Sequence, residues 1–520
     1  MDRAKQINQL DPSTLWDVVV VGGGATGLGV AVDAAARGYK VLLLEKDDFA
    51  KGTSSRSTKL VHGGVRYLQQ GDVRLVLEAL RERGRMKRNV PHLVKDQAFV
   101  ISNYSYWEDF LYFCGLTLYD LLSFGFGYGR SRFISPKTVQ KYLPTIRTKG
   151  LKGGIVYHDG QFDDARMAVN LAQTAVENGA TVLNYAPVTA VTHGDDGLVD
   201  GVDFEDSETG RRYHARARVV INAAGIFVDN IIKMDEPEKK KMVKPSQGVH
   251  LVLDRRFLPG DYAMMVPKTS DGRVLFAVPW HDKVVVGTTD TPRDEPESEP
   301  KYLEKEVDFI LQTAGRYLNP APTRADVETV FTGQRPLAAP QGEGKSTKEL
   351  SRSHKIIVSS HNLITITGGK WTSYRKMAED TVDRAISLHL LAARDCVTRS
   401  FHIHGWRKNP DLHDHRYIYG SDEDAILKLE ASSPELAERL SPKYDYRLSE
   451  VVWAVREEMA RTVEDVLARR VRLLFLDAHE AVRVAPRVAR VLARELGKDE
   501  AWQKHQIVAF GEVAKKFILE

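Results

Sequence analysis

Cysteine is almost absent from this sequence of 520 residues, which contains only Cys114 and Cys396. Two cysteines cannot form the disulfide framework of a small secreted protein, nor the ligand set of a cysteine-rich metal centre. The sequence therefore indicates a reducing compartment, and we predict no metal site.

Long apolar runs are also missing. No uninterrupted stretch approaches the roughly 18 residues that a membrane-spanning helix needs. The first 16 residues carry two aspartates and no apolar core, so they predict neither a signal peptide nor a transit peptide. If the protein meets a membrane, we expect it to lie on the surface.

A strong excess of either charge is lacking too, because 74 basic residues face 70 acidic ones and the formal net charge is only +4. That value is too small to indicate a nucleic-acid partner, but it allows an acidic membrane surface or an anionic metabolite. The length exceeds what one hydrophobic core organises, so two or three domains are expected.

The sequence near the N-terminus predicts a βαβ unit. A β-branched run at residues 17–21 is followed by glycines, an alanine-rich helical pattern and a second buried strand that ends at Glu45. Gly22, Gly24 and Gly27 stand in G-x-G-x-x-G register. Such a loop lets a pyrophosphate approach the backbone at a helix N-terminus, and Glu45 would accept hydrogen bonds from a ribose.

The remaining pattern predicts three domains. Hairpin signals at residues 194–197 and 207–210 precede a buried strand that ends in small residues, and a second β-rich region follows it. Residues 400–412 read as a linker, and helical periodicity dominates beyond them. We predict an α/β Rossmann-like domain (1–92, 152–232 and 353–398), an inserted mixed-sheet substrate or cap domain (93–151 and 233–352), and an α-helical C-terminal domain (399–520).

Eight segments, in order, resemble one known family. They are "VVGGGATGLGVAVDAAARG", "TSSRSTKLVHGGVRYL", "FDDAR", "INAAG", "FAVPWHDKVVVGTTDT", "TGQRPL", "GGKWTSYRK" and "EEMARTVEDVLARR". Together they resemble the FAD-dependent glycerol-3-phosphate dehydrogenases, of the bacterial aerobic type, whose FAD-binding fold is that of D-amino-acid oxidase. The last segment separates this family from amine oxidases that share the front half.

The resemblance implies oxidation of sn-glycerol 3-phosphate to dihydroxyacetone phosphate, with hydride passing from C2 to N5 of a non-covalent FAD. It implies electron transfer to a membrane quinone from a cytoplasmic position on the inner face of the cell membrane. A homodimer is left open. The alternatives are an oxygen-using glycerol-3-phosphate oxidase, an FAD amine or amino-acid oxidase, an NAD-linked dehydrogenase, or a flavin-binding scaffold without activity.

The family motifs also imply a set of cofactor-binding residues. Gly63 and Gly64 would present bare backbone to the flavin ring, while hydroxyls and amides before them would surround the pyrophosphate and ribityl chain. The full predicted set is Gly22, Gly24, Ala25, Thr26, Gly27, Glu45, Lys46, Thr53, Ser54, Ser55, Ser57, Lys59, Leu60, His62, Gly63, Gly64, Val188, Ala223, Ala224, Gly225, Gly333, Arg335, Gly368, Gly369, Lys370, Trp371 and Thr372.

A dianionic phosphate requires at least two fixed cations. By their positions in the motifs, the candidates are Arg66, Arg335, Arg352 and Lys370, since guanidinium groups match phosphate oxygens in a bidentate manner. Lys370 could serve the flavin or the substrate. Thr289 is expected beside the pocket, in contact with the substrate, and the neighbouring Asp290 could equally form a turn.

The reaction also needs a base for the C2 hydroxyl, and a histidine suits that role near neutral pH. His62 and His250 both occupy motif positions near the flavin, and the sequence does not choose between them. We therefore name His62, His250, Arg335 and Lys370 as candidate catalytic residues.

Two segments could contact a membrane or a partner. Residues 104–133 concentrate aromatic residues and leucines, and they read either as ordinary core or as an amphipathic, lipid-facing surface with arginines at its rim. The segment "LARRVRLLFL" at 467–476 is the second candidate, for which packing in a helical bundle is the favoured interpretation.

Overall fold

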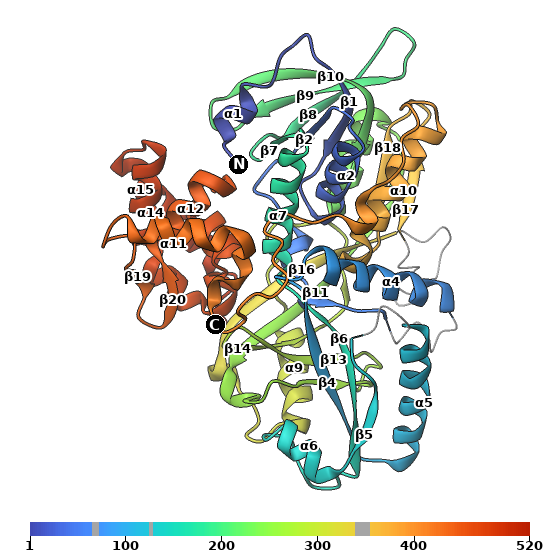
Figure 1. Ribbon diagram of the computed structural model, residues 1–520, viewed down its shortest axis with the longest axis vertical. Coiled ribbons are helices and arrows are strands. Elements are labelled where there is room, and N and C mark those ends of the chain that lie inside the picture. The colour runs from blue at the N-terminus through green and yellow to red at the C-terminus, as the bar shows by residue number, and fades with distance from the viewer. Residues whose placement is uncertain (65–71, 124–127, 339–353) are drawn as a thin grey trace.

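The computed structural model describes residues 1–520 except 65–71, 124–127 and 339–353 (Figure 1). Arg66 and Arg352, two of the predicted phosphate ligands, lie outside the described residues. The first of two large sheets contains the predicted βαβ unit, the second lies beside it, and a helical domain packs against the side of both (Figure 1).

The first sheet is the largely parallel α/β sheet that the sequence predicted. Its strand order is β17-β18-β10-β1-β2-β7, with β9 and β8 continuing from β10. The strands are β1 (Leu15–Val21), β2 (Val41–Leu44), β7 (Thr181–Leu183), β8 (Val188–His193), β9 (Val199–Asp206), β10 (Arg211–Asn222), β17 (Lys355–Val358) and β18 (Ile364–Thr367). The central strands β1, β2, β7, β10 and β18 pair in parallel, and the predicted hairpins join β8, β9 and β10.

Helices cover the parallel strands. Helix α2 packs between α7 and α10, and this layer forms one hydrophobic core with the inner strands. The helices of this part are α1 (Arg3–Ile7), α2 (Ala25–Ala36), α7 (Asp164–Glu177), α8 (Val228–Asp235) and α10 (Tyr374–Ser387). β1 reads as a continuous β-branched run because its inner residues are buried on both faces of the sheet.

The second sheet is mixed and has the order β15-β11-β14-β13-β12-β4-β6-β3, with β16 paired to β11 and β5 paired to β6. Its strands are β3 (Leu60–Val61), β4 (Lys95–Asn103), β5 (Arg132–Ile134), β6 (Gly153–Gln161), β11 (Val243–Asp254), β12 (Ala263–Val266), β13 (Leu275–Trp280), β14 (Lys283–Gly287), β15 (Thr291–Pro292) and β16 (Val327–Ala338). The helices nearby are α4 (Val73–Asn89), α5 (Tyr106–Leu122), α6 (Pro136–Tyr142) and α9 (Glu304–Tyr317).

The C-terminal part is helical, with one small hairpin. Its elements are α11 (Glu423–Ala431), β19 (Arg439–Ser441), β20 (Tyr444–Arg447), α12 (Leu448–Glu458), α13 (Leu473–Leu476), α14 (Ala478–Leu496) and α15 (Glu500–Ala514), with a π-helical turn at Asp465–Arg470. Leu473, Leu474, Phe475 and Leu476 are all buried in its core. The segment 467–476 is therefore bundle packing and not a membrane surface.

The predicted division of the chain needs one correction. Residues 153–161 were assigned to the first domain, but as β6 they pair with β4 of the second sheet, and β3 joins the same sheet. An apolar strand pattern shows that a segment is buried but does not show which neighbour it pairs with. Of the helices in the described ranges, none combines the length and apolar character that crossing a bilayer requires.

The predicted linker at residues 400–412 is held in place by a histidine. His404 contacts Glu177 of α7 through Nδ1 at 2.5 Å and Asp422 through Nε2 at 2.7 Å. Its backbone amide donates to the Thr174 hydroxyl. Burial opposes protonation of His404, but the two carboxylates outweigh it and raise its pKa to about 9.

This raised pKa predicts a loss of stability at alkaline pH. A group whose pKa is higher in the folded state stabilises fully below its unfolded pKa of about 6.5 and loses that contribution as the pH rises through 9. We expect the free energy of unfolding to fall by at most about 3 kcal/mol between these pH values. Urea unfolding at several pH values should show this slope in the wild type and in the exposed control His413→Gln, but not in His404→Gln. An equal slope in His404→Gln would contradict the assignment.

Candidate functional site

A cavity of about 470 Å³ lies where the carboxyl ends of β1, β2 and β10 meet the second sheet. Val21, Leu44 and Ala223 line it from the first sheet, whereas His250 on β11 and Arg335 on β16 line it from the second. Open α/β sheets bind ligands at the carboxyl ends of their strands, and this position fits that rule.

The glycine loop leaves no room for side chains. Gly22 has φ +111°, and a Cβ there would lie 2.7 Å from the carbonyl oxygen of Ala223. A Cβ at Gly27 would lie 1.9 Å from the Gly22 carbonyl oxygen, so Gly27 serves the close packing of helix and strand and does not face the cavity. The amide of Ala25, at the start of α2, donates to Ser54 Oγ at 2.9 Å. The loop thus presents bare backbone and a helix N-terminus to the cavity, which is the arrangement that holds a pyrophosphate.

Glu45 follows β2 and lines the same cavity. Its carboxylate accepts hydrogen bonds from the amides of Gly23 at 2.6 Å and Asp47 at 2.9 Å. Burial raises its pKa to about 7 in spite of these two bonds. The carboxylate is thereby fixed at the cavity wall, and its contact with a ribose hydroxyl stays a prediction.

The structure brings most of the predicted cofactor residues to this cavity. Those that line it are Gly22, Gly24, Ala25, Thr26, Glu45, Lys46, Thr53, Ser54, Ser57, Leu60, His62, Val188, Ala223, Ala224, Gly225, Gly333, Arg335, Gly368, Gly369, Lys370, Trp371 and Thr372. The residues of the predicted set that do not line it are Gly27, Ser55, Lys59, Gly63 and Gly64.

Lys59 was predicted to bind the cofactor, but it does not line the cavity. Its ammonium group is fully buried and donates to Asp164 Oδ2 and to the Ser55 carbonyl oxygen, both at 2.7 Å. The rings of Phe331 and Phe475 lie 5.0 and 5.2 Å from Nζ. Burial lowers the pKa of Lys59 to about 7 although Asp164 opposes the shift. Lys59 therefore supports the loop from behind and does not contact a cofactor phosphate.

Gly63 also lies behind the cavity wall, where it is part of a buried polar network. Its amide donates to the Tyr119 hydroxyl at 2.8 Å, which in turn donates to Asp159 Oδ1 at 2.9 Å. Arg83 Nη1 donates to the same carboxylate oxygen at 2.5 Å. A Cβ on Gly63 would lie 2.5 Å from the Tyr119 hydroxyl, so the glycine is required by this network. It fixes the backbone beside His62, whose side chain lines the cavity.

Arg335 presents a positioned guanidinium group. Nη1 donates to the Thr289 carbonyl oxygen and Nη2 to Thr288 Oγ1, both at 3.2 Å, while Asp290 Oδ1 lies 3.6 Å from Nη1. A Cβ on Gly248 would lie 2.5 Å from Nη2, so the glycine on β11 makes room for the arginine. The Arg335 side chain is 30% exposed and lines the cavity, so its guanidinium group can still reach a ligand there.

Thr289 itself does not line the cavity, which corrects the prediction that it contacts the substrate. Its hydroxyl donates to Glu306 Oε1 at 2.9 Å and accepts from the Val249 amide at 3.0 Å. The contribution of Thr289 to the site is its carbonyl oxygen, which orients Arg335. The side chain could not be assigned from sequence because strand alternation is lost in the turn after β14.

The two candidate bases both line the cavity and differ in surroundings. His250 stacks on Phe331, and its Nε2 lies 2.9 Å from Thr58 Oγ1. Burial, together with the charges of Arg335 and Lys59, lowers its pKa well below the ordinary value. The backbone amide of His62 donates to Thr372 Oγ1 at 3.2 Å, so this histidine is tied to the loop that carries Lys370.

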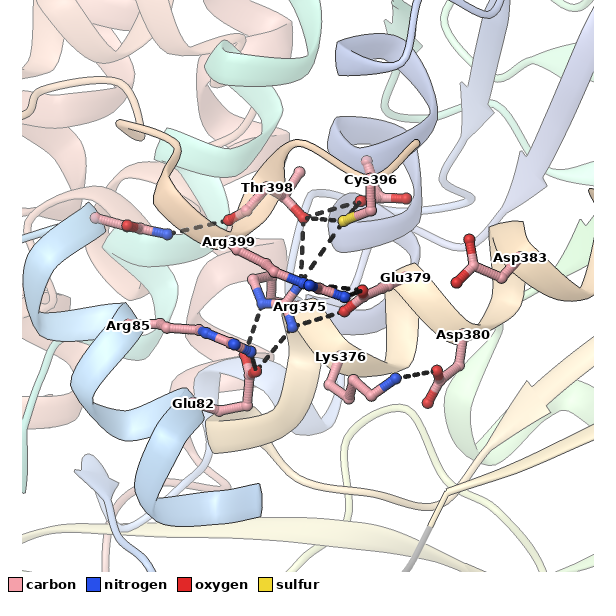
Figure 2. Close-up of polar contacts among 12 residues, drawn as sticks. Glu82, Arg85, Arg375, Lys376, Glu379, Asp380, Asp383, Cys396, Thr398 and Arg399 are labelled. Carbon is pink, nitrogen blue, oxygen red and sulfur yellow. Dashed lines mark hydrogen bonds and ion pairs between the residues drawn. The ribbon is translucent and has the colours of Figure 1, made fainter. Parts of the chain in front are cut away.

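A second buried network connects the helices behind these two loops (Figure 2). Arg375 on α10 binds Glu82 on α4 through Nε and Nη2, both at 2.7 Å, and Glu379 at 2.8 Å. Arg399 contacts Glu379 at 2.5 Å from the other side. Since α4 follows the segment of His62 and α10 follows Lys370, the network fixes the two loops relative to each other.

Some residues of the cavity wall were not predicted. Gly248 is the one for which the sequence carried a signal, because a glycine within a strand pattern marks close approach of another group. Arg56, Thr58 and Phe276 lie within the family segments, but no feature of the sequence showed that they face the cavity. The others carry no local signal, since they reach the cavity only through the packing of distant segments; they include Phe227, Asn230, Met234 and Ser298.

Comparison with known proteins adds two family matches. A family described as "FAD dependent oxidoreductase" matches residues 17–375, and one described as "C-terminal domain of alpha-glycerophosphate oxidase" matches residues 364–503. A probable mitochondrial glycerol-3-phosphate dehydrogenase of Caenorhabditis elegans is 38% identical over 99% of this chain and 77% of its own length. A mitochondrial glycerol-3-phosphate dehydrogenase of Arabidopsis thaliana is also 38% identical, over 96% of this chain and 86% of its own.

Two solved structures are also similar to this chain. A glycerol-3-phosphate dehydrogenase from Bacillus halodurans complexed with FAD aligns with a TM-score of 0.81 at 30% identity, over 99% of this chain and 98% of that chain. An L-alpha-glycerophosphate oxidase from Mycoplasma pneumoniae with FAD bound aligns with a TM-score of 0.56 at 14% identity, over 75% of this chain and 98% of that chain. The second likeness shows a common fold only.

Proposed function

The chain belongs to the family of FAD-dependent glycerol-3-phosphate dehydrogenases, and on that premise we propose that it oxidises sn-glycerol 3-phosphate to dihydroxyacetone phosphate. The observation that carries the proposal is the position of Arg335. Its guanidinium group lies in the same cavity as the bare glycine loop and Glu45, which fit the cofactor. A flavin dehydrogenase for a phosphorylated alcohol needs this pairing of a fixed cation with a dinucleotide cradle.

Arg335 and Lys370 would bind the substrate phosphate or, in the case of Lys370, the polar edge of the flavin. Both line the cavity, from β16 and from the turn before α10 respectively. When bound, the FAD supplies the hydride acceptor at N5. The protein's part is to hold C2 of the substrate in place and to remove the proton of its hydroxyl group.

We propose that His62 is the base that accepts this proton. Protonation of His250 is opposed by its burial and by the charges of Arg335 and Lys59, so it suits a neutral hydrogen-bonding role better than that of a base. His62 lines the cavity and is less buried. In this arrangement His250 orients the substrate hydroxyl, and His62 accepts its proton.

The decisive experiment is an anaerobic titration of the purified flavoprotein with glycerol 3-phosphate, followed by flavin absorbance. We expect bleaching by glycerol 3-phosphate and none by a panel of amino acids. Restoration of colour by a quinone, faster than by oxygen, would support the dehydrogenase over the oxidase. A flavin that stays oxidised with glycerol 3-phosphate would exclude the proposal. His62→Asn should slow bleaching more than His250→Asn, and the reverse order would exchange their assigned roles.

We also propose that quinone is reached from the membrane surface, with α5 as the contact. Leu118 and Leu121 on this helix are 46% and 68% exposed, and Phe133 on β5 is 50% exposed. Arg130 and Arg132 beside them are exposed and would meet anionic headgroups. We propose that these side chains together form an apolar patch with a cationic rim, and that this patch lies at the inner face of the cell membrane.

Sedimentation with anionic vesicles tests this surface. We expect Leu118→Ser/Leu121→Ser to reduce vesicle binding severalfold, because each leucine loses its contact with the acyl region. Val508→Ser, which alters another exposed apolar residue at 65% exposure, should bind like the wild type. Equal binding of all three proteins would place the contact elsewhere. Flavin reduction in solution should be unaffected by these changes.

We expect Glu45 to increase the affinity of the protein for FAD. Replacing it by Gln removes the negative charge that would accept the ribose hydroxyl, while it keeps the size and one acceptor. We expect FAD to bind the apoprotein about tenfold more weakly, in line with about 1.5 kcal/mol for a hydrogen bond to a charged group. Fluorescence titration with FAD measures this, and circular dichroism of the apoprotein checks the fold. An unchanged affinity would show that Glu45 only holds the loop.

A further inference from the structure

Two histidines and a buried aspartate meet at the edge of the first sheet, outside the cavity. His193 ends β8, Asp235 ends α8, and His361 lies in the turn between β17 and β18. His193 Nε2 and His361 Nδ1 each lie 2.8 Å from Asp235 Oδ1. From these contacts we propose that this cluster is a binding site for a divalent transition metal of the zinc class, although the sequence predicted none.

The donor atoms match the chemistry of such ions. Imidazole nitrogen and carboxylate oxygen are ordinary zinc ligands, at about 2.0–2.2 Å, and a site with three protein ligands keeps a fourth position for water. One ligand atom from each residue lies within 4.8 Å of the other two. The two rings stand at 89° to each other with centroids 5.3 Å apart, so they converge on the carboxylate from different directions.

The environment of the Asp235 carboxylate favours a bound cation. The Asp235 side chain is fully buried, and its Oδ2 has no hydrogen-bond partner within the described part of the chain. A buried carboxylate oxygen left unpaired is costly. Asp235 also stands at the C-terminal end of α8, where the helix dipole disfavours an anion. A bound cation would relieve both costs.

The cluster is fixed in place and yet open to solvent. The His361 amide donates to Ser359 Oγ at 3.3 Å, and its carbonyl oxygen accepts from the Val199 amide at 2.8 Å. His193 is 29% exposed and His361 is 40% exposed, so an ion can enter from the solvent side. The three ligands come from three separate segments, and a bound metal would cross-link the β8–β9 hairpin, α8 and the β17–β18 turn.

Zinc binding to the purified, chelator-treated flavoprotein tests the site. Equilibrium dialysis against Zn²⁺ with elemental analysis should give one equivalent, and competition with a colorimetric chelator gives its affinity. His361→Asn keeps a donor toward Asp235 but removes the imidazole, and it should weaken zinc at least about tenfold, as loss of metal-site partners does. Asp235→Asn should do the same.

His214→Asn is the matched control. His214 Nδ1 lies 2.8 Å from Asp203 Oδ1 on the β9–β10 hairpin, a histidine–aspartate pair that is not part of the three-residue cluster. This variant should bind zinc like the wild type, and X-ray absorption of the wild-type complex should show two imidazole ligands. Flavin content and circular dichroism of each variant check the fold. Zinc affinity unchanged in His361→Asn, or no stoichiometric zinc in the wild type, would overturn the proposal.

Discussion

Arg335→Ala is expected to raise the KM for glycerol 3-phosphate 100-fold or more while the protein stays fully loaded with flavin. Two charge-assisted hydrogen bonds to a phosphate contribute about 1.5–3 kcal/mol each, and the alanine variant loses both. The flavin is retained because the glycine loop and Glu45, which form its cradle, do not depend on the guanidinium group. Steady-state kinetics with an artificial acceptor give kcat and KM separately.

Arg335→Lys should fall between the wild type and the alanine variant, because an ammonium keeps the charge but not the two parallel donors. Arg324→Ala is the control, since this arginine is 39% exposed and pairs with Glu304 and Asp308 on α9. A fall in kcat with an unchanged KM would show that Arg335 acts only in the transition state and does not bind the phosphate.

The sequence predicted what depends on local pattern. Gly22, Gly24 and Glu45 line the cavity as expected, because strand, loop and helix are set by residues close to one another in the chain. Only the family resemblance predicted Arg335 as a site residue, because β16 lies almost 300 residues after Glu45 in the chain. The neighbouring Gly248 explains that position, because a glycine there leaves space for the guanidinium group.

Apart from the sheet assignment of residues 153–161, the failures of the sequence prediction concern the direction in which a residue faces. Lys59 follows a serine-rich loop that does line the cavity, but its φ of +63° belongs to a turn that local pattern does not reveal. Its partner Asp164 lies 105 residues later, in the motif "FDDAR". A lysine near a cofactor loop looks like a phosphate ligand until the buried carboxylate that pairs with it is known.

The tail motif shows the same dependence on distant partners. Asp48, just after the first βαβ unit, contacts Arg469 Nε at 2.5 Å and Arg470 Nη1 at 2.8 Å. Burial opposes ionisation of Asp48, but the charges of Arg470 and Arg469 outweigh it and hold the pKa of Asp48 below its usual range. Arg472 donates to Asp164 at 3.0 Å. The arginines of the tail therefore join the C-terminal domain to the segments around the cofactor cavity.

Asp48→Asn should accordingly destabilise the whole protein by about 3–5 kcal/mol. The change removes the carboxylate shared by two fully buried guanidinium groups, and each charge-assisted hydrogen bond lost costs about 1.5–3 kcal/mol. The arginines are not left unpaired, because Arg469 keeps Glu464 and Asp465 and Arg470 keeps Glu458. Asp445→Asn is the control, because Asp445 and its partner Arg439 are 60% and 51% exposed, and it should cost about 1 kcal/mol or less. Urea unfolding of the flavin-loaded proteins, followed by tryptophan fluorescence, measures both. If Asp48→Asn were as stable as the control, the contacts of Asp48 with Arg469 and Arg470 would contribute little to holding the C-terminal domain in place.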